Sequence, residues 1–175
     1  MSNMEYNTVN GALFISCGLP GSGKTTWLMK NFDAPKDNKV VVSRDNIRFD
    51  LLKPGEDYFS HEEEVFDEFV NRITWHINNG FDVVADATHL NKGSRLKLLA
   101  ALTIAGCHPR FVAAVYFSTP LEICLKRNEQ RKGTKFYVPE STIRNMANKY
   151  HPPTRSNFYK NIYEIDENGE LSFAV

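Results

Sequence analysis

Eight consecutive residues, Gly18 to Thr25, have the types and spacing that phosphate chemistry requires. They read GLPGSGKT, a full match to the pattern G-x-x-x-x-G-K-[ST]. The glycines allow a tight turn that brings backbone N–H groups close to phosphate oxygens. The Lys24 ammonium can reach the β- and γ-phosphates, and the Thr25 hydroxyl can bind Mg²⁺. We therefore predict a nucleoside triphosphate site that consists of Gly18, Pro20, Gly21, Ser22, Gly23, Lys24, Thr25 and Thr26.

Two carboxylates follow other apolar runs of the chain. Asp45 comes just after Val40–Val42, and Arg48 follows one helical turn later. A carboxylate near the terminal phosphate can orient an acceptor hydroxyl and take its proton. Arg48 can then hold an anionic group of the acceptor or hold Asp45 itself, although a helix cap beside a surface charge would explain the same residues. Asp86 can bind Mg²⁺ or pair with a cation, and a plain strand-end turn is its alternative.

Two arginines lie four residues apart further along the chain. Arg127 and Arg131 would share one face of a helix. Guanidinium groups in that position can close over a triphosphate and stabilise charge on the transferred group. A solvated basic helix face is the alternative interpretation.

The elements that must position these residues alternate between strand and helix. Short apolar runs predict strands at 13–17, 39–42, 81–85, 111–117 and 162–165, and Asn168-Gly169 indicates a turn into a final hairpin at 171–174. Helical patterns lie between them. Such alternation predicts an α/β fold, in which a mostly parallel sheet of about five strands is covered by helices on both faces. Since the carboxyl ends of parallel strands share one edge, we expect Lys24, Asp45 and Asp86 to meet there.

Length and composition favour an ordinary folded domain. The 175 residues suit one domain, 1–175, with 1–10 as a flexible lead-in. Three widely spaced cysteines in or beside apolar segments predict reduced core thiols, and neither a membrane-spanning run nor a signal peptide is evident, so we expect a cytoplasmic protein.

Charge is distributed unevenly along the chain. Net charge is zero, but 92–160 holds 13 lysines and arginines against 3 acids, while the rest holds 8 against 18. This asymmetry favours one positive face, unless the two sets interleave on the surface.

Four segments taken together resemble a known family. GLPGSGKTT, SRDNIR, DATHLN and CLKRNEQR, in this order, resemble the phosphate-loop, acceptor-site, third-strand and lid motifs of the polynucleotide kinase group of P-loop kinases. The resemblance runs from about Leu13 to Ile165 and implies the three-layer P-loop kinase fold with an arginine-bearing lid at about 119–137. It also implies a kinase without the phosphatase or ligase domains that other members of this group carry.

The resemblance implies an activity and a role for each matching residue. The activity is transfer of the γ-phosphate of ATP, with Mg²⁺, to a 5′-hydroxyl end of DNA or RNA, most simply a single-stranded end. The implied catalytic residues are Asp45 as general base, Lys24, and the lid residues Arg131 and Arg127. The implied acceptor residues are Arg48 as the ligand of the acceptor's neighbouring phosphate, Asp86 as its supporting carboxylate, Thr88 and Asn91. Thr25 and Asp86 are the implied metal residues.

Two other functions remain open at this point. A P-loop kinase of a small molecule, such as a nucleoside, a nucleotide sugar or another metabolite, would share the loop, the base and the lid arginines. An ATP-hydrolysing switch module would need only the loop, and the presence of Asp45 and Arg48 disfavours it. The sequence does not distinguish DNA from RNA, and it leaves the nucleotide donor and the oligomeric state open.

Some residues with chemical potential are given structural roles instead. The histidines show no zinc-ligand spacing, and we expect His89 to be a solvent-exposed turn residue. Trp75 lies beside the apolar face of a predicted helix and is expected at or near the core. Phe136 and Tyr137 can either stack on a base or pack beneath the lid.

Overall fold

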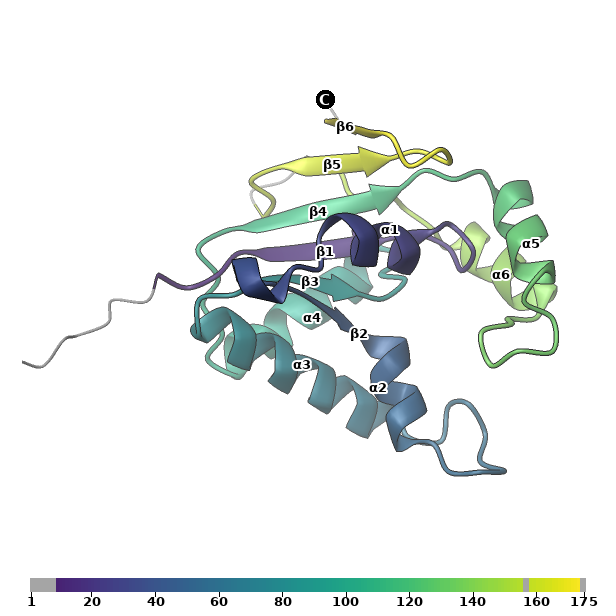
Figure 1. Ribbon diagram of the computed structural model, residues 1–175, viewed down its shortest axis with the longest axis horizontal. Helices are drawn as coiled ribbons and strands as arrows, with labels where there is room; N and C mark the ends of the chain where they lie inside the picture. The colour runs from purple at the N-terminus through teal and green to yellow at the C-terminus, as the bar shows by residue number, and fades with distance from the viewer. Residues whose placement is uncertain (1–8, 156–157, 174–175) are drawn as a thin grey trace, which may run out of the picture.

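The computed structural model describes residues 9–155 and 158–173, so most of the predicted lead-in lies outside the described residues. A central sheet is flanked by helices on both faces (Figure 1). The strands are β1 (Leu13–Cys17), β2 (Lys39–Ser43), β3 (Asp82–Asp86), β4 (Val112–Phe117), β5 (Ile162–Ile165) and β6 (Leu171–Phe173). The helices are α1 (Lys24–Asn31), α2 (Arg44–Leu51), α3 (Glu62–Asn78), α4 (Lys92–Ile104), α5 (Leu121–Glu129) and α6 (Glu140–Asn148), with a 3₁₀ turn at Pro35–Asp37.

The sheet has the order β2-β3-β1-β4-β5-β6, which places the first strand of the chain in its interior. All pairs are parallel except β5 with β6, which form the antiparallel hairpin expected after Asn168-Gly169. The sheet therefore has six strands, one more than the five expected, because the short β6 joins its edge. The α/β class and the three layers are confirmed.

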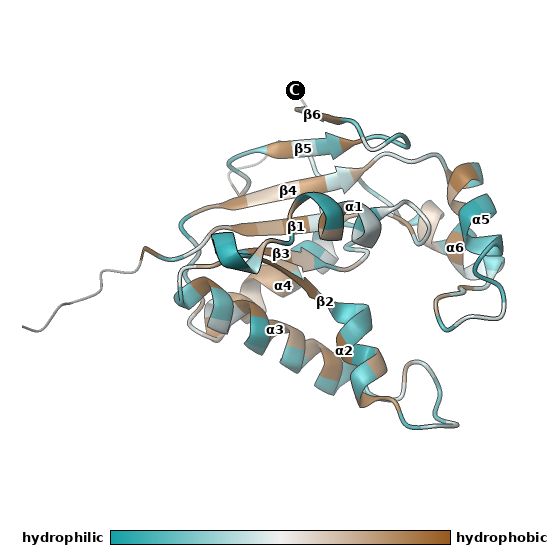
Figure 2. Ribbon diagram, in the orientation of Figure 1, coloured by the Kyte–Doolittle hydropathy of each residue, from teal (hydrophilic) through white to brown (hydrophobic). Residues whose placement is uncertain are grey.

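Alternating side chains fill the two faces of the sheet. In β1, Leu13 and Ile15 belong to a core packed against α3 and α4, while Phe14 points to the other face, where Leu28 of α1 packs. The strands are hydrophobic through their middle portions, and α3 is hydrophobic on one side only (Figure 2). This two-sided burial explains why the central strands read as continuous apolar runs in the sequence.

Two expectations about apolar residues have different outcomes. All three cysteines are buried and outside any disulfide, as predicted. The prediction that Trp75 is at or near the core is wrong, since the residue is 59% exposed. Its ring lies against those of His76 and Phe81, at the margin of the apolar face of α3. No helix in the described part of the chain is long and apolar enough to cross a membrane.

Candidate active site

The phosphate loop joins β1 to α1, and its glycines have conformations that other residues would strain. Gly21 and Gly23 have φ of 81° and 94°. A Cβ on Gly21 would lie 2.4 Å from the Cys124 carbonyl oxygen, so the loop has no room for a side chain there. The Ser22 hydroxyl is buried without a hydrogen-bond partner among the described residues. Such an unsatisfied hydroxyl within a glycine-rich turn fits a loop that binds an oxyanion.

Lys24 is the buried cation of this loop. Its Nζ donates to the carbonyl oxygens of Gly18 and Leu19, each at 2.9 Å. Burial lowers the pKa of Lys24, and the negative charges of Asp86 and Asp45 oppose this shift. These two negative charges thus favour the charged form of Lys24.

Asp86 lies at the end of β3, directly below the start of α1. Its carboxylate accepts hydrogen bonds from the Thr25 hydroxyl at 2.8 Å and the Ser16 hydroxyl at 3.2 Å. Burial raises the pKa of Asp86, while the Lys24 charge lowers it. A hydroxyl and a carboxylate side by side below a phosphate loop fit Mg²⁺, which takes one or two protein oxygens together with phosphate oxygens and waters. In the described residues no group of three or more His, Cys, Asp or Glu is placed to hold a metal.

Asp45 lies in the first turn of α2, next to the edge formed by the strand ends. Ser43, the last residue of β2, pairs in register with Asp86, so the chain brings Asp45 to the same edge as the phosphate loop. The Asp45 carboxylate accepts hydrogen bonds from Arg48 and, at 3.0 Å, from the Tyr58 hydroxyl. Burial, together with the Asp45 charge, raises the pKa of Tyr58 to about 12, so this hydroxyl remains a donor at neutral pH.

Arg48 is 5% exposed, and three side chains bind its guanidinium group. It donates to Asp45, to the Tyr58 hydroxyl at 2.9 Å and to the Glu62 carboxylate at 2.6 Å. The prediction that Asp86 supports Arg48 is wrong, because Asp86 bonds to Ser16 and Thr25 while Glu62 occupies the supporting position. Contact between Arg48 and an acceptor phosphate stays a prediction. The three bonds use the Nε and one of the two Nη groups of its guanidinium.

Glu62 and Tyr58 are the residues of this site that the sequence reasoning missed. Glu62 begins α3, where an acid is already favourable at the positive end of the helix dipole. It also binds Arg44 at 3.0 Å, so one carboxylate joins two arginines of α2. No periodicity in the sequence links position 62 with position 48. The one available signal is that the SRDNIR motif contains two arginines, Arg44 and Arg48, and that buried cations need acidic partners.

The turn after β3 is tied to the phosphate loop. The Gly18 N–H donates to the Thr88 carbonyl oxygen at 3.0 Å. His89 is 7% exposed, which contradicts the solvent-exposed position expected for it. Its Nδ1 lies 2.8 Å from the Ser16 carbonyl oxygen, and burial lowers its pKa to about 4. Asn91 caps α4 through a hydrogen bond from the Ser94 N–H, so its predicted contact with substrate would be a second role.

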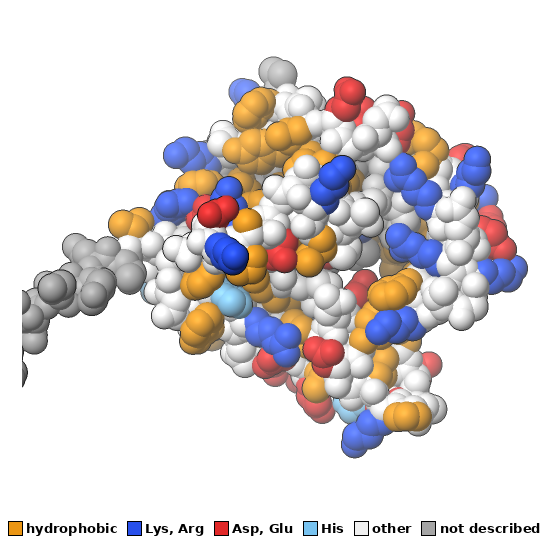
Figure 3. Space-filling model, viewed as in Figure 1, with side chains coloured by type: hydrophobic (Ala, Val, Ile, Leu, Met, Phe, Trp, Pro, Cys, Tyr) orange, Lys and Arg blue, Asp and Glu red, His pale blue; other side chains and the backbone are white. Residues whose placement is uncertain are grey.

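The two predicted lid arginines lie at the end of α5 and just after it. Arg127 donates to the Glu167 carbonyl oxygen at 2.8 Å and to the Ser22 carbonyl oxygen at 3.4 Å. No hydrogen bond or ion pair joins the Arg131 guanidinium to another described residue, which leaves it available to a ligand. Lysines and arginines gather over α5, on the right of the view, beside a hollow in the near face (Figure 3).

This hollow has a volume of about 480 Å³. Its lining comes from the phosphate loop, α1, the end of α5 and the turn after β5, and includes Gly21, Ser22, Gly23, Thr26, Trp27, Arg127, Arg131, Asp166, Glu167, Asn168 and Gly169. The Trp27 indole N–H donates to the Gly169 carbonyl oxygen at 2.9 Å and so holds the turn against α1. A space of this size beside a phosphate loop can hold the nucleoside of a bound nucleotide.

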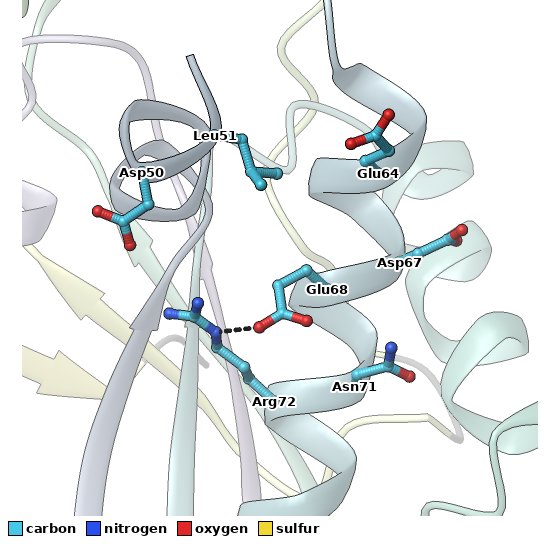
Figure 4. A pocket seen from close by; sticks show the side chains of 7 residues that line it. All are labelled: Asp50, Leu51, Glu64, Asp67, Glu68, Asn71 and Arg72. Atoms are coloured by element: carbon cyan, nitrogen blue, oxygen red, sulfur yellow. Dashed lines mark hydrogen bonds and ion pairs between the residues drawn. The ribbon is translucent and has the colours of Figure 1, made fainter. Parts of the chain in front are cut away.

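A second hollow lies between α2 and α3, away from the phosphate loop (Figure 4). Acidic side chains dominate it, and its one cation, Arg72, is paired with Glu68. None of the predicted site residues lines it.

A family model described as an AAA domain, AAA_33, matches residues 13–153. The chain belongs to this family. It has the fold of the P-loop kinases, since solved kinase structures match it over most of its length. No match is found among curated protein sequences.

Solved structures of the same fold include kinases of different substrates. A chain of the Pnkp1/Rnl/Hen1 RNA repair complex has a TM-score of 0.65 and 23% identity. The match covers 85% of the present protein and 46% of the chain from the complex. A fungal RNA kinase has a TM-score of 0.60 and 15% identity, over 90% and 75% of the two chains. The APS kinase CysC of Mycobacterium tuberculosis, in complex with AMPPNP and APS, has a TM-score of 0.54 and 19% identity, over 90% and 88%. The chain thus spans less than half of the RNA repair protein.

Proposed function

We propose that this protein transfers the γ-phosphate of ATP to the 5′-hydroxyl of a single-stranded DNA or RNA end. One observation carries the proposal. The Asp45 carboxylate, oriented by Arg48 and Tyr58, follows β2, whose last residue, Ser43, pairs in register with Asp86 beside the phosphate loop. Transfer to an alcohol needs a group that aligns the hydroxyl and accepts its proton, and a carboxylate held in this way can do both.

ATP and Mg²⁺ would be held by the phosphate loop and the residues below it. The backbone N–H groups of the loop and Lys24 would bind the β- and γ-phosphates, and the Thr25 hydroxyl and the Asp86 carboxylate would hold the metal. Mg²⁺, when bound, supplies positive charge to the phosphate oxygens. The nucleoside would occupy the hollow between α1 and α5.

The remaining proposed roles concern the acceptor and the transferred group. Asp45 orients the acceptor hydroxyl and takes its proton, and Arg131 stabilises charge on the transferred phosphoryl group. Arg127 fixes the wall of the nucleoside hollow through its bonds to Glu167 and Ser22. Thr88 and Asn91 are proposed to line the acceptor side of the same edge.

A polynucleotide acceptor is supported over a small metabolite by two features. The four motifs occur together in the order and spacing of the polynucleotide kinase group, and basic residues gather over α5 and the turn after it. Likeness to a protein of an RNA repair complex and to an RNA kinase agrees with this choice. The similar likeness to an APS kinase makes a small acceptor the competing outcome of the test.

The test follows label from γ-labelled ATP, with Mg²⁺, to three possible acceptors: a 5′-hydroxyl oligonucleotide, a nucleoside 3′-monophosphate, and water. We expect label on the oligonucleotide. Asp45→Asn should lower the rate about a hundredfold or more while ATP binding, measured at equilibrium, is unchanged. Asp50→Asn, an exposed acid of the same helix, is the matched control and should retain the wild-type rate.

Other outcomes would contradict the proposal in different ways. Release of free phosphate with no labelled acceptor would indicate a switch. Label on the mononucleotide alone would indicate a small-molecule kinase. A wild-type rate in Asp45→Asn would remove Asp45 as the general base.

A further inference from the structure

Four aromatic rings form a continuous row beside the candidate general base. Ring centroids are 4.8 Å apart for Phe59 and Tyr58, 6.1 Å for Tyr58 and Phe49, and 5.3 Å for Phe49 and Phe136. The row therefore runs from the 52–61 loop, across α2, to the loop that follows α5. We call these four residues the aromatic row. It bridges the acceptor side of the site and the lid side, which are far apart in the sequence.

The row is attached to the catalytic machinery at Tyr58. The Tyr58 hydroxyl donates to Asp45, and the Arg48 guanidinium lies 4.5 Å from the centroid of the Tyr58 ring. Both ends of the row face solvent, since Phe59 is 59% exposed and Phe136 is 48% exposed. The exposed rings therefore belong to the same chain of contacts as the candidate general base.

A cation lies within the row on the lid side. The Lys135 ammonium is 4.4 Å from the centroid of Phe49 and 5.3 Å from that of Phe136. Lys135 is itself exposed, so its charge remains accessible to an anion. Flat apolar faces next to a cation match one chemistry closely, because a nucleotide chain has a base to stack and a phosphate to neutralise at each step. A sugar or a sulfated metabolite offers hydroxyl and anionic groups but far less flat surface.

The two exposed rings differ from the two rings between them. Phe49 and Tyr58 are partly buried and support the row from within, through ring contacts and the bond to Asp45. Phe59 and Phe136 each contact one other ring of the row, and the cations of Arg48 and Lys135 lie 6.0 Å and 5.3 Å from their respective centroids. Much of each ring is nevertheless exposed. The two exposed rings come from separate loops and lie at opposite ends of the row.

We propose that Phe59 and Phe136 stack on bases at the 5′ end of a single-stranded acceptor, while Lys135 contacts a phosphate of the same strand. This inference rests on the proposed polynucleotide acceptor and names the residues that recognise it. Stacking of this kind tolerates any base, so the aromatic row accounts for binding of an end without reading its sequence.

The test compares two 5′-hydroxyl oligonucleotides that differ only in whether the first nucleotides carry bases or are abasic. The variants are Phe59→Ala, Phe136→Ala, the double variant and the conservative Phe136→Tyr. Phe173→Ala is the matched control, because Phe173 is 69% exposed on β6 and its ring contacts Tyr163 instead of the row. The rate measured is kcat/KM for label transfer from ATP.

The wild type should prefer the oligonucleotide with bases about a hundredfold, since two stacked bases contribute roughly 1–3 kcal/mol each and 1.4 kcal/mol is a factor of ten. Each alanine variant should lose about tenfold on the oligonucleotide with bases and little on the abasic one. The double variant should show no preference, Phe136→Tyr should keep the preference because it keeps an aromatic face, and Phe173→Ala should behave as wild type. Equal wild-type rates on the two oligonucleotides would overturn the stacking role even though label transfer supports the proposed function.

If no oligonucleotide is labelled, the proposed function fails, and equilibrium binding then decides the stacking role. Fluorescence anisotropy of the same labelled oligonucleotides gives that measurement. Tighter binding of the oligonucleotide with bases, lost in the double variant, supports the aromatic row as a nucleic-acid site. Absent or base-independent binding overturns it.

Discussion

The Glu62 carboxylate lies at the centre of the charge network that orients Asp45. It binds the guanidinium groups of Arg44 and Arg48, and Arg48 in turn binds Asp45. A buried guanidinium that loses its partner keeps its cost of burial, so such a network depends on each member. At the scale of single residues, Glu62 therefore acts as a positioning residue that does not itself need to touch the substrate.

Glu62→Gln removes the shared negative charge and should lower kcat about tenfold, because Asp45 loses its fixed orientation. The KM for ATP should be unchanged, since Lys24, Thr25 and Asp86 are untouched. The free energy of unfolding, measured with urea, should fall by about 1–3 kcal/mol as Arg48 loses a partner.

Glu68→Gln provides the control on the same helix. Glu68 pairs with Arg72 at 2.6 Å, the same distance as between Glu62 and Arg48. Both side chains of the Glu68–Arg72 pair are exposed, however, whereas Arg48 is buried. Loss of this surface pair should change the free energy of unfolding by less than about 1 kcal/mol and leave kcat as it is. Equal effects of the two substitutions would contradict the positioning role of Glu62.

At the scale of elements, two arginines at and just after the end of α5 line the same hollow in different ways. The Arg127 guanidinium is held by two backbone carbonyl groups, from the phosphate loop and from the turn after β5. Arg131 lines the same hollow without such bonds to described residues. The end of one helix thus provides both an arginine fixed in the wall of the hollow and one without such bonds to the described residues.

These different settings predict different kinetics. Arg127→Ala should raise the KM for ATP about tenfold with little change in kcat, because the wall of the hollow loosens. Arg131→Ala should lower kcat about a hundredfold, the usual loss when one group that stabilises transition-state charge is removed. Steady-state kinetics would distinguish them, with Lys126→Ala, an exposed residue of α5 outside the hollow, as the control. Identical effects of the two arginine substitutions would contradict this division.

The sequence predicts the position of the phosphate loop and the meeting of Lys24, Asp45 and Asp86 because both depend on local pattern and on the common edge of parallel strands. It does not predict the partner of Arg48. Glu62 reaches Arg48 across an irregular loop, and loop geometry has no period in the sequence. Nor does the sequence predict the burial of His89, because the polar residues around position 89 do not show that β1, α3 and α4 enclose its ring.

At the scale of the whole molecule, the buried His89 joins three parts of the fold. Its ring contacts the β1 backbone at Ser16 and lies against Phe69 of α3, and its carbonyl oxygen accepts a hydrogen bond from Arg95 of α4. Burial makes the protonated form of the imidazole unfavourable in the folded protein, whereas the same side chain in the unfolded chain is in water and takes up a proton at its ordinary pKa.

This difference predicts a loss of stability in mild acid. The folded pKa of His89 is about 4, against an ordinary value of 6.5, so the unfolded state binds the extra proton as the pH falls between these values. The free energy of unfolding should therefore decrease by about 3 kcal/mol from this group as the pH falls from 6.5 to 4. Urea unfolding at several pH values should show a shallower decrease in His89→Asn than in the wild type, whereas His108→Asn, at an exposed histidine, should follow the wild type. Parallel curves for His89→Asn and the wild type would contradict the burial argument.

The strand order has a consequence for how such a protein can change its substrate. The groups proposed to bind the triphosphate follow β1 and β3 in the interior of the sheet, whereas Asp45, Arg48 and most of the aromatic row follow β2 at its edge. An edge strand has only one neighbour, so we expect exposed positions beyond it to vary with few effects on the interior. Within residues 44–61, Ile47 is fixed by the core and Arg48 by Glu62. A new acceptor would therefore be accommodated by changing the exposed positions around these two, while the donor half is inherited unchanged.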